Sequence, residues 1–249
     1  MNMIHICGLS EARELEAEKP AEEAPYGDRL VQVIKSMECD RIGVILRHSV
    51  REQGRRGGVA NPDMVAGLTP HGHRESERFG RSLPGGFNLV VGYSPVPRCV
   101  ETATGIIDGY SHVRPGGVSD VGVDDSLAVT HFFAKDTAAM ESYRGRVGGL
   151  PFLREWLDGT LPVGMMTPPS EVKRFVISRV GQGLKAGQAP LLRLWVGHDY
   201  GLILLIETIF GGRFEDNGWI PYLDGIVFCL SREGTLSATW EGKVVDLSA

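Results

Sequence analysis

The stretch RIGVILRHSVREQG, residues 41 to 54, decides the fold and raises a chemical question. Its run from Ile42 to Leu46 is apolar without alternation, a pattern typical of a strand buried on both faces of a sheet. The run ends at Arg47 and His48, and Arg51 follows three residues later. We therefore expect a central strand of a largely parallel sheet, with one histidine among arginines at its end.

The overall composition is that of an ordinary globular chain. It has 249 residues, 42% hydrophobic and 23% charged, which suits one large α/β domain. A net charge of -5 argues against a nucleic-acid partner, because phosphate-backbone affinity needs local basicity. No apolar run approaches the ~20 residues that span a bilayer, and no secretory signal is evident, so we predict no membrane partner and a cytoplasmic location. Four scattered cysteines are expected to be reduced thiols: Cys7, Cys39, Cys99 and Cys229.

Strand and helix patterns alternate along the chain. FNLVVGYSP (residues 87 to 95) and PLLRLWVGHD (190 to 199) predict two more buried strands, and 225 to 247 predicts strands around a Glu233-Gly234 turn. Helical patterns occupy residues 26–38, 68–83, 97–110, 169–185 and 200–212. This alternation predicts a mostly parallel sheet with helices on both faces. Residues 1–26 are acidic and are predicted to precede a domain that spans 27–249.

The three clearest strands end at polar residues. Ligands of open parallel sheets bind beyond the carboxyl ends of the strands, so these side chains are expected to face one cleft. The candidates are Arg47, His48, Arg51, Arg98, His198 and Asp199.

This set of side chains suits phosphoryl transfer. Arginine is permanently charged and forks onto oxyanions, so three arginines around one point predict a phosphoryl site. A neutral histidine can attack phosphorus, and a second, protonated histidine could share the charge of the transition state. Asp199 is the only carboxylate at these strand ends and is the candidate proton donor.

Several segments resemble, in the expected order, motifs of the histidine phosphatase superfamily. LRHSVRE is similar to the RHG nucleophile motif, and Arg51 to its RHGxRxP form in the acid phosphatase branch. LTPHG resembles the LTxxG segment, and YSPVPRCVETA the segment whose arginine binds phosphate. VGHDYGLILLI resembles the HD motif, and IPYLDGIVFCL the PPYAS-type strand. The match runs from about residue 41 to 230.

The resemblance implies a three-layer α/β/α sandwich with a small helical cap insertion at about residues 110–170. It implies a phosphomonoesterase that acts on a small-molecule phosphomonoester through a phosphohistidine on His48, without metal or organic cofactor. Arg47, Arg51, Arg98 and His198 would bind the phosphate. Asp199 would be the general acid, as in the acid phosphatase branch.

The chain departs from the family pattern at three positions. Ser49 replaces the usual glycine after the nucleophile, and Glu52 adds a negative charge nearby. The mutase-like branch takes its acid from a glutamate, and VDDSLAVTHF offers Ala128 there, which favours the acid phosphatase mode.

Other roles stay open for several of these residues. Asp199 could serve as a helix N-cap, alone or in addition to its chemical role. His71 and His73 suggest a metal site, but no third ligand is evident. Arg55 and Arg56 either recognise the substrate or are simply solvated.

Two alternative functions also stay open. A phosphomutase of the same fold would return the phosphoryl group to its substrate. A non-catalytic protein would bind a phospho-ligand without turnover, which Ser49 and Glu52 would favour. The physiological substrate and the oligomeric state are not predicted.

Overall fold

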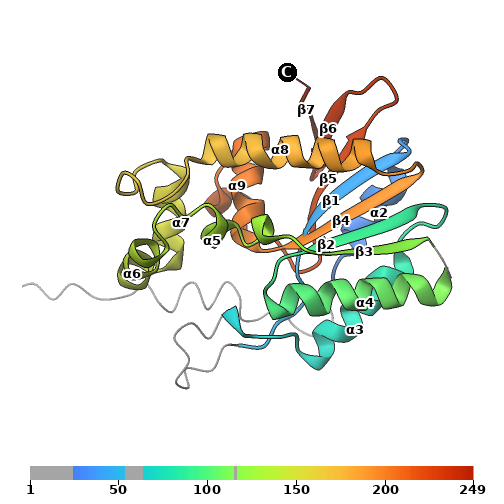
Figure 1. Cartoon of the computed structure of the whole chain (residues 1–249), viewed down its shortest axis with the longest axis horizontal. Coiled ribbons are helices and arrows are strands. Elements are labelled where there is room, and N and C mark those ends of the chain that lie inside the picture. The colour runs from blue at the N-terminus through green and yellow to red at the C-terminus, as the bar shows by residue number, and fades with distance from the viewer. Residues whose placement is uncertain (1–24, 54–63, 115–116, 249) are drawn as a thin grey trace, which may run out of the picture.

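The computed structural model describes residues 25–53, 64–114 and 117–248. Most of the acidic segment 1–26, together with Cys7, Arg55 and Arg56, lies outside the described residues. A seven-stranded sheet crosses the molecule in the order β3-β2-β4-β1-β5-β6-β7 (Figure 1). Its strands are β1 Arg41–Arg47, β2 Asn88–Tyr93, β3 Val118–Val123, β4 Leu191–Gly197, β5 Gly225–Leu230, β6 Leu236–Trp240 and β7 Lys243–Asp246.

The sheet is parallel where the site forms and antiparallel towards the C-terminus. The pairs β1–β4, β2–β4 and β2–β3 are parallel, and the crossover helices between these strands cover its faces. β5 runs antiparallel to β1, and β6 and β7 continue the sheet as antiparallel strands. The parallel core and the strands after residue 225 were both expected from the sequence.

Helices cover both faces of the sheet, which confirms the three-layer α/β/α arrangement. The first face is covered by α2 (Asp28–Ser36), α3 (Pro70–Ser82) and α4 (Pro97–Val113), and the second by α8 (Pro169–Ala186) and α9 (Asp199–Phe210) (Figure 1). Within β1, Val44 and Leu46 pack in the hydrophobic core on the first face, and Ile45 packs in the core on the second face. The strand is therefore without polar side chains from Ile42 to Leu46, because both of its faces are covered.

Short helices form the segment inserted between β3 and α8. They are η2 (Asp125–Leu127), α5 (Val129–Phe132), α6 (Thr137–Val147) and α7 (Gly149–Leu157). Helices α5 to α7 lie beyond one end of the sheet, at the left of Figure 1. Residue 110 belongs to α4, and β3 pairs with β2, so the inserted helices begin later than the expected start at residue 110. One further short helix, α10 (Phe214–Asn217), follows α9.

The cysteines differ from the expectation of four reduced thiols. Cys39 and Cys229 form a disulfide, with their Cα atoms 6.1 Å apart. Cys39 comes just before β1, and Cys229 lies opposite Ile42 in the antiparallel β1–β5 pair, so the sheet brings the two sulfur atoms together. Cys99 is a buried free thiol. Among the described residues, no helix is both long and apolar enough to cross a membrane.

Candidate active site

The register of the parallel strands places their ends side by side. Arg47, the last residue of β1, is paired with Gly197, the last residue of β4. Tyr93, the last residue of β2, is paired with Val196. The next residues along each strand, His48, Ser94 and His198, therefore meet at one edge of the sheet.

The partners of His48 determine which of its ring nitrogens carries the proton. Nδ1 lies 2.7 Å from the backbone carbonyl of Ser49, which can only accept, so Nδ1 carries the hydrogen. Nε2 accepts a hydrogen bond from Arg98 Nε at 3.0 Å, so Nε2 has a free electron pair. Burial, and then the charges of Arg47 and Arg98, hold the pKa of His48 well below 6.5. The ring is therefore neutral and has the tautomer that a nucleophile needs.

His198 stands beside His48, with their ring centroids 5.6 Å apart. Its Nδ1 lies 3.1 Å from Arg98 Nη2, which donates, and its Nε2 lies 2.9 Å from Ser94 Oγ. Burial, followed by the charge of Arg98, lowers the pKa of His198 to about 3. At neutral pH this histidine therefore carries no charge, whereas the charge-sharing role would require the protonated ring.

Arg98 links the two histidines because it occupies the first turn of α4. Pro97 opens that helix, and the guanidinium of the next residue points back to the strand ends. Thr102, one turn later, donates to the carbonyl of Arg98 at 2.6 Å and accepts from the backbone N–H of Ser49 at 3.0 Å. Thr102 thus connects α4 to the segment that follows β1.

Asp199 is the first residue of α9, and His198 occupies the N-cap position, so Asp199 is not itself the cap. Its Oδ1 accepts from the N–H of Tyr200 at 2.9 Å. Its Oδ2 lies 3.0 Å from Arg47 Nη2 and accepts from Trp219 Nε1 at 3.2 Å. Burial opposes the charge, but Arg47, His198 and these hydrogen bonds together lower the pKa of Asp199. At neutral pH Asp199 is therefore a carboxylate.

Arg47 is held by a segment that the sequence interpretation used only as a family motif. Its Nη1 donates to the carbonyl of Ile220 at 2.7 Å, and its guanidinium lies 4.1 Å from the ring centroid of Tyr222. Trp219, the residue before Ile220, contacts Asp199. The roles of Trp219 and Tyr222 were missed. The only signal for Tyr222 was the PPYAS-type resemblance, which assigns it no role, and Trp219 lies one residue before that segment.

The remaining candidate positions have simpler surroundings. Ser49 is buried, and its hydroxyl donates to the carbonyl of Gly72 at 2.8 Å, so it binds α3. Arg51 lies after β1, where it forms a β-bridge with Leu68 and donates from Nη1 to the Glu52 carbonyl at 3.4 Å. Its place in the phosphate site stays a prediction. Glu52 is exposed, and Ala128 is buried at the start of α5.

No group of three or more His, Cys, Asp or Glu side chains suited to a metal ion occurs in the described part of the chain. His73 lies 3.4 Å from Glu101, and the ring of His71 lies 6.0 Å from that of Tyr26. The arginines and histidines at the strand ends form a separate cluster, and such a cluster suits an oxyanion.

Comparison with known proteins identifies the fold. No family model and no curated protein match the chain. A phosphoserine phosphatase from Entamoeba histolytica in complex with 3-phosphoglyceric acid is 15% identical, with a TM-score of 0.52 over 81% of this chain and 96% of that chain. YhfR from Bacillus stearothermophilus is 16% identical, with the same TM-score and coverage. The chain therefore has the fold of these two proteins, an α/β fold of the kind that the sequence resemblance implied.

Proposed function

We propose that the protein is a phosphomonoesterase that works through a covalent phosphohistidine on His48. The observation that supports this most directly is the state of the His48 ring. Its Nε2 electron pair is unprotonated and lies between the strand ends, 3.0 Å from the guanidinium of Arg98. A buried neutral nucleophile beside fixed positive charge suits attack on a phosphoryl dianion.

In the first step, the phosphoryl oxygens accept hydrogen bonds from Arg47 and Arg98, and Arg98 Nε turns from His48 Nε2 to an oxygen. His48 Nε2 then forms the N–P bond while the P–O bond to the leaving oxygen breaks. Asp199 gives its proton to that oxygen, so an alcohol leaves. His198 lies within the same group. A bound dianion favours protonation of its ring, as it does for Asp199, and the protonated ring then shares the phosphoryl charge.

In the second step, water attacks the phosphorus of phospho-His48. Asp199, now a carboxylate, accepts one proton from that water as the N–P bond breaks. Inorganic phosphate leaves, and the neutral ring and the protonated carboxyl group are restored. The carboxylate form that Arg47 stabilises suits this second step directly.

Asp199 must gain a proton before the first step. Arg47 disfavours this protonation, because its guanidinium stabilises the carboxylate at 3.0 Å. A bound phosphoryl dianion competes for Arg47 and adds negative charge nearby, and both effects raise the pKa of Asp199. Substrate binding would therefore provide the protonated acid, in the manner of the acid phosphatase branch.

A small-molecule phosphomonoester is the proposed substrate class. The E. histolytica neighbour was solved with 3-phosphoglyceric acid, which supports a small phosphate-bearing ligand for this fold. The cytoplasmic location stays a prediction. The Cys39–Cys229 disulfide weighs against it, because most disulfides persist in oxidising compartments.

The test is hydrolysis of p-nitrophenyl phosphate between pH 4 and pH 8 in EDTA, with wild type, His48→Ala and Asp199→Asn. We expect turnover by wild type and none by His48→Ala. We also expect a phosphoenzyme, trapped by denaturation at alkaline pH because the N–P bond is labile in acid, that only proteins with His48 form. Phosphoenzyme hydrolysis that is slow until a bisphosphate is added would indicate a mutase. Stabilisation by phosphate without turnover across the pH range would refute the phosphatase proposal and indicate a binding protein.

A further inference from the structure

Trp219 lies outside the strand-end motifs, and its side chain donates a hydrogen bond to Asp199. Its Nε1 donates to Asp199 Oδ2 at 3.2 Å. The indole stands edge-on between two rings, with its centroid 6.0 Å from that of Tyr200 and 5.7 Å from that of Phe214. Two perpendicular aromatic contacts restrict the rotation of the indole, so its N–H keeps one direction.

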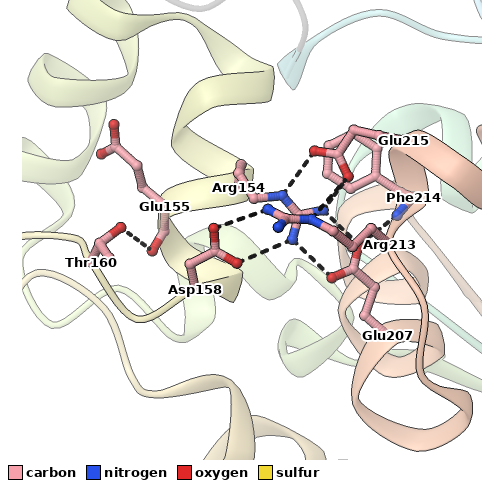
Figure 2. Close-up of polar contacts among 8 residues, drawn as sticks. All are labelled: Arg154, Glu155, Asp158, Thr160, Glu207, Arg213, Phe214 and Glu215. Atoms are coloured by element: carbon pink, nitrogen blue, oxygen red, sulfur yellow. Dashed lines mark hydrogen bonds and ion pairs between the residues drawn. The ribbon is translucent and has the colours of Figure 1, made fainter.

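A group of five charged side chains lies next to these rings. We call it the Arg154 network, and Figure 2 shows its contacts. Arg154 on α7 donates to Glu207 of α9 at 2.7 and 3.0 Å, and from Nε to Glu215 of α10 at 2.8 Å. The other members, Asp158 and Arg213, are paired at 3.1 Å. The Arg154 side chain is 16% exposed and that of Glu207 is 11% exposed, so solvent screens this pair less than a surface pair.

The Arg154 network holds the ring that supports Trp219. Glu207 Oε1 accepts from the backbone N–H of Phe214 at 2.6 Å, and the guanidinium of Arg154 lies 4.7 Å from the Phe214 ring centroid. Phe214 in turn meets Trp219 at an interplanar angle of 89°. The inserted helix α7 is therefore connected to Asp199 through Phe214 and Trp219.

We propose that Trp219 is a positioning residue for Asp199, and that the Arg154 network keeps Trp219 in place. This rests on the proposed function, because Asp199 acts there as acid and base. The indole N–H fixes the orientation of Asp199 Oδ2. It also stabilises the carboxylate form of Asp199 between the first and second steps of the reaction. When Asp199 is protonated, Oδ1 or Oδ2 carries the hydrogen. Oδ2 has two donors, Arg47 and Trp219, whereas Oδ1 has the N–H of Tyr200, so the proton is favoured on Oδ1.

The other groups that act on the charge of Asp199 are known from the structure. Arg47 approaches from β1, His198 precedes it at the end of β4, and the backbone N–H of Tyr200 donates to it. The Cys99 thiol of α4 lies near enough to feel the charge of Asp199. None of these is changed when the indole N–H is removed. A shift seen in Trp219→Phe is therefore assignable to the lost hydrogen bond.

The first experiment needs no enzymatic activity. Nitrogen-15 NMR of the indole N–H groups of the four tryptophans is followed against pH, and Trp219 is assigned by its absence from Trp219→Phe. We expect the Trp219 signal to move as Asp199 titrates in wild type, and to lose that movement in Asp199→Asn. His198 is present in both proteins and cannot produce the difference. Identical Trp219 titrations in the two proteins would overturn the proposal even if the phosphatase proposal holds.

The second experiment is kinetic. We expect Trp219→Phe to lower kcat for an alkyl phosphate about tenfold, the size of one hydrogen bond to a charged group, with little change in KM. The loss should shrink for p-nitrophenyl phosphate, whose leaving group needs no proton. The alkaline limb of kcat/KM should move to higher pH, because the ionised carboxylate loses a donor. An unshifted limb would reject the positioning role.

Two sets of variants complete the test. Trp240→Phe is the matched control, because Trp240 Nε1 has no acceptor among the described residues and its ring packs on Phe210. This variant should leave kcat and both limbs of the pH profile of kcat/KM unchanged. Arg154→Met should shift the limb in the same direction as Trp219→Phe, and Arg154→Lys should restore part of the effect. Unchanged kinetics in Arg154→Met, with the fold intact by circular dichroism, would remove the Arg154 network from the proposal.

Discussion

The burial of His198 predicts a specific loss of stability in acid. Folding lowers the pKa of this imidazole from 6.5 to about 3, first through burial and then through Arg98. Between these values the unfolded chain binds a proton that the folded protein rejects. The contribution is therefore fully present above pH 6.5 and is lost as the pH falls towards 3.

The magnitude follows from the width of that interval. A pH of 4.5 lies about two units below the pKa of the imidazole in the unfolded chain. Each unit corresponds to roughly 1.4 kcal/mol of stability. His198 should therefore remove roughly 2 to 3 kcal/mol between pH 7 and pH 4.5. This amount depends on the unfolded-state pKa, provided that the folded-state pKa lies below 4.5. It is a large part of the ~5–15 kcal/mol that stabilises a typical domain.

The assay is urea unfolding of wild type and His198→Gln at both pH values. Glutamine can accept from Arg98 and donate to Ser94, as the neutral ring does, but it does not titrate. His48 has a lowered pKa too and adds a loss of the same sign in both proteins. The wild type should lose roughly 2 to 3 kcal/mol more than the variant. Equal losses would show that His198 is protonated in the folded protein at pH 4.5 and would refute the reasoning.

Three further predictions concern the candidate site. The kcat/KM for a phosphomonoester should be highest on the acidic side of neutrality. A lowered pKa keeps His48 neutral in acid, and Asp199 of the free enzyme gains its proton only at acidic pH. An alkaline optimum in stopped assays would contradict this. Ser49→Ala should cost about 1 kcal/mol in urea unfolding and leave kcat within about threefold, because its hydroxyl bonds to Gly72 and not to the phosphoryl site. Arg51→Ala should raise KM about tenfold if Arg51 binds phosphate, and an unchanged KM would remove it from the site.

Much of the fold could be predicted because burial on both faces leaves a mark in the sequence. The apolar runs before His48 and His198 have no alternation, and both are inner strands of the parallel core. The start of the inserted helices was harder to predict. β3 lies at the edge of the sheet and is largely exposed, so it lacks the continuous apolar run of an inner strand.

The sequence by itself determined that the polar residues after β1 and β4 come together. Parallel strands end at one edge of a sheet, so the residues that follow β1 and β4 had to lie near one another. Only the tertiary structure decided the protonation states of His48 and Asp199, because these depend on burial and on donors from distant segments. Trp219 reaches Asp199 across 20 positions of sequence, and no local pattern predicts such a contact. The disulfide between Cys39 and Cys229 likewise follows from the antiparallel pairing of β1 and β5 and from no cysteine spacing.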